Sequence, residues 1–128
     1  MRFVLDASAL LAGLNAEAGA DRVAAALDFA VVSAVNLAEV AGGLARGGNS
    51  PERVRAVLMT LACTVVPADE EMAIEVGLMR GVTDRVGLSL GDRFCLALGR
   101  RLRATVLTAD RQWAVIAEDV GVKVELIR

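Results

Sequence analysis

Five short apolar runs alternate along the chain with longer segments whose apolar positions recur every three to four residues. The short runs predict buried β-strands, and the longer segments predict helices with one apolar face. Strands that alternate with helices typically form a parallel sheet covered on both faces. We therefore expect a three-layer α/β/α fold with a central, mainly parallel sheet of four to five strands. The expected strands cover residues 2–5, 31–33, 64–66, 105–108 and 122–126.

Start and stop signals give approximate bounds for the helices. The clearest start is Ser50-Pro51-Glu52, where serine caps a helix and proline takes the first helical position. Residues 81–90 contain glycine and are expected to form a loop with at most a short turn. No linker, repeat or low-complexity tract interrupts the pattern, so residues 1–128 are expected to form one domain. The expected helices cover residues 9–14, 19–29, 36–45, 51–62, 69–80, 91–102 and 110–118.

The composition excludes several kinds of chemistry. The chain has no histidine and no tyrosine, which rules out histidine bases, Ser-His-Asp and Cys-His triads and a tyrosine nucleophile. Its two cysteines, Cys63 and Cys95, are too far apart in sequence to make a zinc-binding pair. Any bound metal would be held by oxygen, which favours Mg²⁺ or Mn²⁺. Hydrophobic residues make up 55% of the chain, which suggests that some apolar surface remains for a partner.

Four acidic residues lie at or near the ends of the expected strands. Asp6 follows the first strand and Asp110 the fourth, Glu39 lies in the helix after the second, and Asp92 opens the helix before the fourth. Because parallel sheets bind ligands at the carboxyl ends of their strands, all four can reach one edge. Taken singly, the three aspartates are ordinary helix caps and Glu39 lies on a solvated helix face.

Taken together, four carboxylates with no lysine or arginine among them would repel one another. Two such charges about 4 Å apart cost about 4 kcal/mol at an effective dielectric constant of 20. One or two divalent ions would remove this cost, and such ions also activate water for phosphodiester hydrolysis.

Four motifs carry these acids in a fixed order. They are LDASA at 5–9, NLAEV at 36–40, LSLGDRFCLAL at 88–98 and LTADRQW at 107–113. This set resembles the PIN-domain ribonucleases, and within them the VapC-type toxins of bacterial toxin–antitoxin pairs. The similarity extends from the first strand to the last helix.

This resemblance implies roles for individual residues. Asp6, Glu39, Asp92 and Asp110 match the catalytic, metal-binding acids of the family, and the hydroxyls of Ser8 and Thr108 and the polar Asn36 match positions that support the site. The family hydrolyses RNA, commonly tRNA or ribosomal RNA, with Mg²⁺ or Mn²⁺. It also forms homodimers, and a cognate antitoxin covers its acidic site.

Other classes of protein fit the sequence less well. The main alternative is a PIN-like protein-binding module with little or no catalysis. A response-regulator receiver needs an acidic pair and a suitably placed lysine, whereas Asp6 is single and the only lysine is Lys123. A metal-dependent adhesion module needs the pattern DxSxS, whereas this chain has DASAL.

Several further features bear on partners and location. The net charge of −2 suits a local, metal-bridged RNA contact better than a broad basic groove. The arginines at 100, 101 and 103 are either phosphate contacts or a solvated helix end, and Arg93 and Arg111 can pair with the neighbouring acids or with substrate. Trp113 is expected in the core. With no secretory signal and no apolar run of about 20 residues, we expect a cytoplasmic protein without membrane contact.

Overall fold

The computed structural model describes residues 2–128, and within them five strands form a single sheet in the order β3-β2-β1-β4-β5. Every neighbouring pair is parallel, as the alternation of strands and helices predicted. All five expected strands are present. Their bounds are Phe3–Leu5 for β1, Ala30–Ser33 for β2, Thr64–Val66 for β3, Thr105–Thr108 for β4 and Val124–Leu126 for β5.

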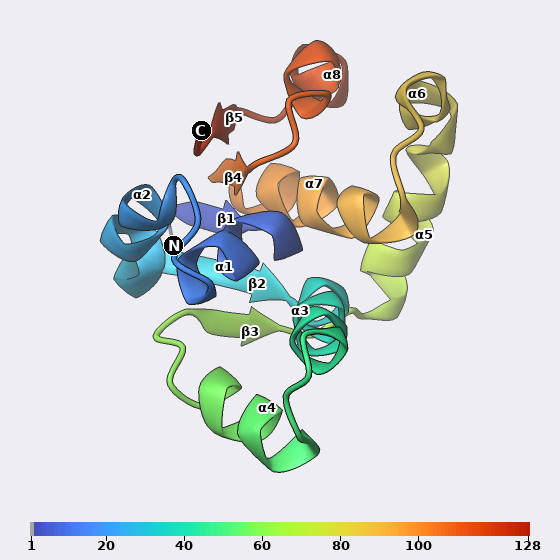
Figure 1. The fold of residues 1–128 in the computed structure, drawn as a ribbon. Helices are drawn as coiled ribbons and strands as arrows, with labels where there is room; N and C mark the ends of the chain where they lie inside the picture. Colours follow the sequence, from blue (N-terminus) through green and yellow to red (C-terminus); the bar gives the residue numbers. More distant parts are fainter. Residues whose placement is uncertain (1) are drawn as a thin grey trace.

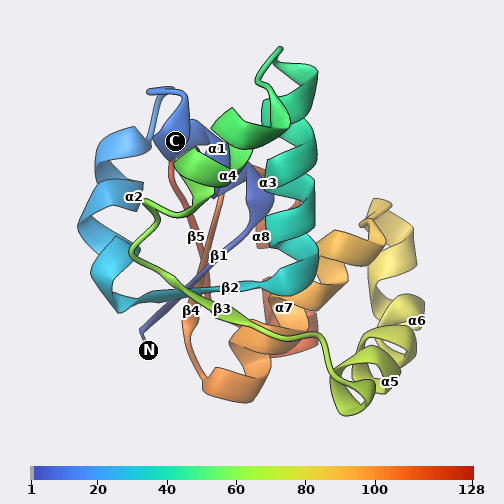
Figure 2. The same cartoon turned by 90° about the horizontal axis from the view of Figure 1, so that it is seen from below.

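The helices make two layers around this sheet (Figures 1 and 2). α1, α2 and α4 pack on one face, and α5, α7 and α8 on the other, while α3 contacts both α1 and α7. The helical elements are α1 Ala7–Leu14, α2 Ala20–Ala26, η1 Leu27–Phe29, α3 Ala34–Arg46, α4 Pro51–Leu58, α5 Glu70–Leu78, α6 Arg80–Thr83, η2 Asp84–Val86, α7 Leu90–Leu102 and α8 Trp113–Val120.

The sheet separates two apolar cores. Alternate strand residues point to opposite faces, so Leu5 and Leu107 pack with α1 to α4, whereas the neighbouring Val4 and Val106 pack with α5, α7 and α8. This two-sided burial explains why the central strands β1, β2 and β4 are continuous apolar runs. The edge strands differ from the expected burial, since β3 is mostly exposed and β5 only partly buried. Trp113 is fully buried in the second core, as expected.

Some helix bounds differ from the sequence prediction. Residues 81–90 were expected to be a loop, but they include most of α6 and all of η2. Here the Arg80–Asp84 ion pair spans one helical turn, and Gly87 ends the segment at a φ of +68°. The helix expected from 110 begins only at Trp113, because the Asp110 carboxylate accepts the Gln112 N–H and forms a turn first.

The other helices also differ in extent from their expected ranges, and α1, α3 and α5 do so by one or two residues at one or both ends. The helix expected over 19–29 divides into α2 and the tighter η1, the helix expected over 51–62 ends at Leu58, and α7 begins at Leu90 with Ser89 as its cap.

The topology creates one switch point at the carboxyl edge of the sheet. From β1 the chain passes through α1 and α2 to β2 on one side, whereas β4 lies on the other side of β1. Crevices at such points are the usual ligand sites of parallel α/β sheets. No helix in the described part of the chain is both long and apolar enough to cross a membrane.

Candidate functional site

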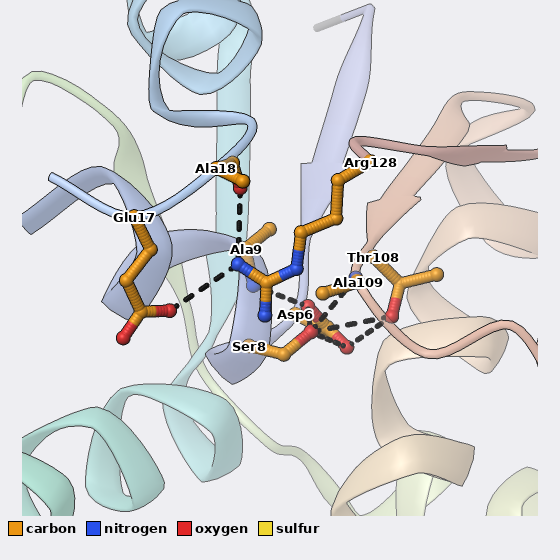
Figure 3. Close-up of polar contacts among 8 residues, drawn as sticks. All are labelled: Asp6, Ser8, Ala9, Glu17, Ala18, Thr108, Ala109 and Arg128. Carbon is orange, nitrogen blue, oxygen red and sulfur yellow. Dashed lines mark hydrogen bonds and ion pairs between the residues drawn. The ribbon is translucent and has the colours of Figure 1, made fainter. Parts of the chain in front are cut away.

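Asp6 lies at the switch point, directly after β1, and caps α1 (Figure 3). Its carboxylate accepts hydrogen bonds from the Ala9 N–H at 2.8 Å, from the Ser8 hydroxyl at 2.7 Å and from the Thr108 hydroxyl at 2.6 Å. The residue is only 4% exposed. Burial raises the pKa of Asp6 to about 6, although these three hydrogen bonds act to lower it, and the negative charge of Asp92 raises it further.

Ser8 and Thr108 join the end of β1 to the end of β4. Each hydroxyl donates to Asp6 and also accepts a backbone N–H from the segment after β4. The Ser8 hydroxyl accepts from Ala109 and the Thr108 hydroxyl accepts from Asp110, both at 3.0 Å. The backbone of Asp110 is thereby linked to Asp6 through the Thr108 hydroxyl.

Asp92 lies in the first turn of α7. Its carboxylate accepts the Ser89 N–H at 2.9 Å, and the Ser89 hydroxyl accepts the Asp92 N–H at 3.2 Å, which together form a capping box. Asp92 therefore does cap the helix, but from its third position. Burial raises the pKa of Asp92, and the negative charge of Asp110 raises it further, so Asp92 and Asp110 also influence each other electrostatically.

Glu39 reaches the site from α3. Its carboxylate accepts a hydrogen bond from the Asn36 side-chain amide at 2.7 Å, and the same amide donates to the Gly91 carbonyl at 3.0 Å. Asn36 is 1% exposed, whereas Glu39 is exposed. This pair of hydrogen bonds connects α3 to the start of α7, one residue before Asp92.

The fully buried Cys95 shows that the acids share one region. Burial raises the pKa of the Cys95 thiol well above its usual value, and the charges of Asp6, Asp92 and Glu39 raise it further. The thiol therefore stays protonated and is a poor metal ligand. Six ion pairs form within residues 2–128, and none of them includes Asp6, Glu39, Asp92 or Asp110.

The donor chemistry of this region fits a hard divalent cation. Its side chains offer carboxylate, hydroxyl and amide oxygens, which Mg²⁺ and Mn²⁺ prefer. The buried Oδ1 of Asn36 also has no hydrogen-bond partner. As the side chains stand, no three acidic or cysteine residues in the described range are close enough to hold an ion. Binding would therefore need at least one of the carboxylates to rotate toward the others.

Three of the nearby arginines, Arg93, Arg100 and Arg101, have partners outside the four acids. The Arg93 side chain reaches the Val76 carbonyl of α5, at 3.5 Å. Arg100 pairs with Glu75 and Arg101 with Asp69, which fastens α7 to the segment that begins α5. These contacts account for two of the clustered arginines without any phosphate.

The sequence analysis did not assign a role to Gly91 or Ser89. Ser89 begins a serine-x-x-aspartate capping pattern that was recognisable in the sequence. The contact of Gly91 with Glu39 had no such local signal, because it depends on how α3 packs against α7.

The protein has an all-parallel sheet between two layers of helices, and carboxylates lie at the switch point of that sheet. These features define a three-layer α/β/α protein with an acidic candidate site. The sequence model of the PIN domain matches residues 3–119, and the chain belongs to the PIN domain family, as its motifs indicated. None of the curated proteins matches the chain.

Solved structures show the same fold. One is a chain of the DNA-bound VapBC from Salmonella typhimurium, with a TM-score of 0.76 and 22% identity over 100% of this chain and 99% of that one. A second is VapBC-1 from nontypeable Haemophilus influenzae, with a TM-score of 0.71 and 21% identity over 99% of this chain and 98% of that one. A third is FitAcB from Neisseria gonorrhoeae, with a TM-score of 0.67 and 23% identity over 95% of each chain.

Proposed function

We propose that this chain is a metal-dependent endoribonuclease and the toxin of a type II toxin–antitoxin pair. The observation that carries the proposal is that four carboxylates lie at or near the switch point of a PIN fold, and none of them is in an ion pair within residues 2–128. Similar structures include a toxin–antitoxin complex from Klebsiella pneumoniae, with a TM-score of 0.70 and 19% identity over 98% of this chain and 97% of that one.

In this proposal Asp6, Glu39, Asp92 and Asp110 hold Mg²⁺ or Mn²⁺. When bound, such a cation supplies a water of lowered pKa and stabilises the charge that develops on the phosphate. Ser8 and Thr108 keep Asp6 and Asp110 at a fixed separation through their paired hydrogen bonds. Because burial raises the pKa of Asp6, cation binding has to displace a proton from it near pH 6, and affinity should rise with pH.

The substrate we propose is a structured RNA, either tRNA or ribosomal RNA. Arg100 and Arg101 are held by Glu75 and Asp69, and the net charge is −2, so a local contact at the acidic edge fits better than a wide basic groove. The natural inhibitor would be a cognate antitoxin that covers this edge.

Cleavage of RNA by the purified protein tests the proposal. We expect activity with Mg²⁺ or Mn²⁺, no activity in excess EDTA, and no activity for Asp92→Asn, whose amide oxygen can still cap α7. The matched control is Asp84→Asn, which removes an exposed acid paired with Arg80. RNA ends mapped after cleavage would identify the substrate. Activity that persists in excess chelator, or in Asp92→Asn, would contradict the metal mechanism.

A protein-binding module is the second candidate. The feature that favours it is an apolar groove between α3 and α4, lined by Ala41, Ala45, Pro51, Val54 and Leu58. Absence of cleavage by metal-loaded, antitoxin-free protein, together with tight binding of a partner protein, would favour this alternative.

We also propose a homodimer that forms through the exposed apolar face of α5 and α6. Ile74, Leu78 and Val82 are spaced four residues apart along α5 and α6 and are all exposed, Leu78 by 80%. Light scattering should report a dimer for the parent and a monomer for Leu78→Lys. Val115→Lys, on another exposed apolar residue, in α8, should remain dimeric. A parent that is monomeric at tens of micromolar would contradict this expectation.

A further inference from the structure

Gly91 packs directly against the carboxylate of Glu39. A Cβ atom built at Gly91 would lie 2.5 Å from both carboxylate oxygens, closer than non-bonded atoms approach. The backbone at Gly91 is helical and does not require glycine for its conformation. Glycine is therefore needed at this position only because Glu39 occupies the space that a side chain would fill.

Asn36 holds the same carboxylate from the other side. Its side-chain nitrogen donates to Glu39 and to the Gly91 carbonyl, and because both partners are acceptors the orientation of the amide is unambiguous. This orientation leaves Oδ1 buried without a donor. An unpaired buried acceptor costs stability, so a residue chosen only to fill the core would not be asparagine. The polar side chain instead serves the contact between Glu39 and α7.

We propose that Gly91 and Asn36 are positioning residues, which fix the Glu39 carboxylate beside the start of α7 so that Glu39 and Asp92 share one divalent cation. This inference rests on the proposed function, since it assigns Glu39 to the same metal as Asp92. It adds a requirement for a residue without a side chain immediately before Asp92.

The Gly91→Ala variant separates this role from ordinary packing. The obstacle to the new methyl group is the end of a flexible, exposed side chain, so Glu39 can swing aside and the fold survives. Alanine also favours a helix over glycine, which offsets any remaining strain. We expect a melting temperature close to that of the parent, together with Mn²⁺ binding that is about tenfold weaker, the usual effect of losing a residue that orients a metal ligand.

The experiment measures Mn²⁺ affinity by electron paramagnetic resonance on the full chain, beside thermal melts of the same samples. Two other helical glycines provide controls. The new methyl group of Gly77→Ala on α5 meets open space, so this variant should raise the melting temperature slightly through helix propensity and leave Mn²⁺ affinity unchanged. Gly99→Ala on α7 places its Cβ 2.5 Å from the Val106 side chain, so it should lower the melting temperature but leave Mn²⁺ affinity unchanged.

A double-mutant cycle tests whether Gly91 acts through Glu39. In a Glu39→Gln background the ligand charge is already lost, so Gly91→Ala should weaken Mn²⁺ binding little further. Asn36→Ala is a second variant, which removes the donor without adding bulk, and it should weaken binding in the parent but not in Glu39→Gln.

The possible results are distinguishable. A parent that binds Mn²⁺ and a Gly91→Ala variant that binds it equally well would overturn this inference and leave the proposed function intact. A tenfold loss that persists in the Glu39→Gln background would overturn it too, because Gly91 would then act by another route. A parent that binds no Mn²⁺ would overturn both the inference and the metal-dependent function.

Discussion

Replacing Asp6 by asparagine is expected to stop RNA cleavage and to raise the melting temperature of the metal-free protein at pH 7. Asp6 is 4% exposed and has no cationic partner among the described residues, so its ionised form is unfavourable without metal. Asparagine has nearly the same shape and can still accept the Ala9 N–H, which preserves the cap of α1. A thousandfold loss of cleavage would correspond to about 4 kcal/mol of transition-state stabilisation.

The pH dependence of stability follows from the same carboxylate. The pKa of Asp6 is about 6 in the folded protein and 3.8 when the side chain is free in solvent, so the folded protein binds this proton more tightly. The free energy of unfolding should therefore increase as the pH falls from about 7 to about 4, by about 3 kcal/mol for this group. Burial raises the pKa of Asp92 as well, so protonation of Asp92 should also increase the free energy of unfolding as the pH falls. Urea unfolding across this range should show the increase in the parent and a smaller one in Asp6→Asn.

Asp69→Asn is the matched control. Asp69 also caps a helix, and its carboxylate accepts the Met72 N–H at 2.8 Å, but it is exposed and paired with Arg101. Its pKa is lowered, first by that backbone hydrogen bond and then by Arg101. The substitution should leave cleavage intact and should not stabilise the protein at pH 7. An Asp6→Asn protein that is no more stable than the parent without metal, and that still cleaves RNA, would remove Asp6 from the site.

The sequence predicted the sheet well because a buried parallel strand has a local signature. Every short apolar run became a strand, and Asp6 and Asp110 follow β1 and β4 as expected. The short helix after α5 was missed because its stabilising contacts, such as the Arg80–Asp84 pair, are individually weak signals in a glycine-containing segment.

The sequence predicted which residues belong to the candidate site but not how they contact one another. Its order of acids is visible in the motifs, but the contact of Glu39 with Gly91 depends on the packing of α3 against α7. The same applies to the hydroxyls of Ser8 and Thr108, whose partners lie about a hundred residues away in sequence. Helix caps, in contrast, depend on neighbouring residues. The cap at Asp6 was predicted correctly, Asp92 takes part in a capping box whose cap residue is Ser89, and Asp110 was wrongly expected to cap α8, which begins after Gln112.

Thr108→Val is expected to destabilise the metal-free protein by about 2–4 kcal/mol at pH 7, although the two side chains have nearly the same shape. The Thr108 hydroxyl is fully buried, donates to Asp6 at 2.6 Å and accepts the Asp110 N–H at 3.0 Å. Valine would leave a buried carboxylate without its shortest hydrogen bond and a backbone N–H without its partner. Cleavage should fall as well, because the segment that carries Asp110 would no longer be tied to Asp6.

The loss of stability caused by Thr108→Val should also depend on pH. Among the groups that lower the pKa of Asp6, the Thr108 hydroxyl has the largest effect, so its removal should raise that pKa above 6. Protonated Asp6 depends less on a donor, so the destabilisation should be smaller at pH 5 than at pH 7. Thr83→Val is the control, since Thr83 is equally buried but its hydroxyl donates only to the Met79 carbonyl of the preceding turn. Urea unfolding that shows equal losses for both variants, with no pH dependence, would mean that Thr108 contributes to packing rather than to the charge of Asp6.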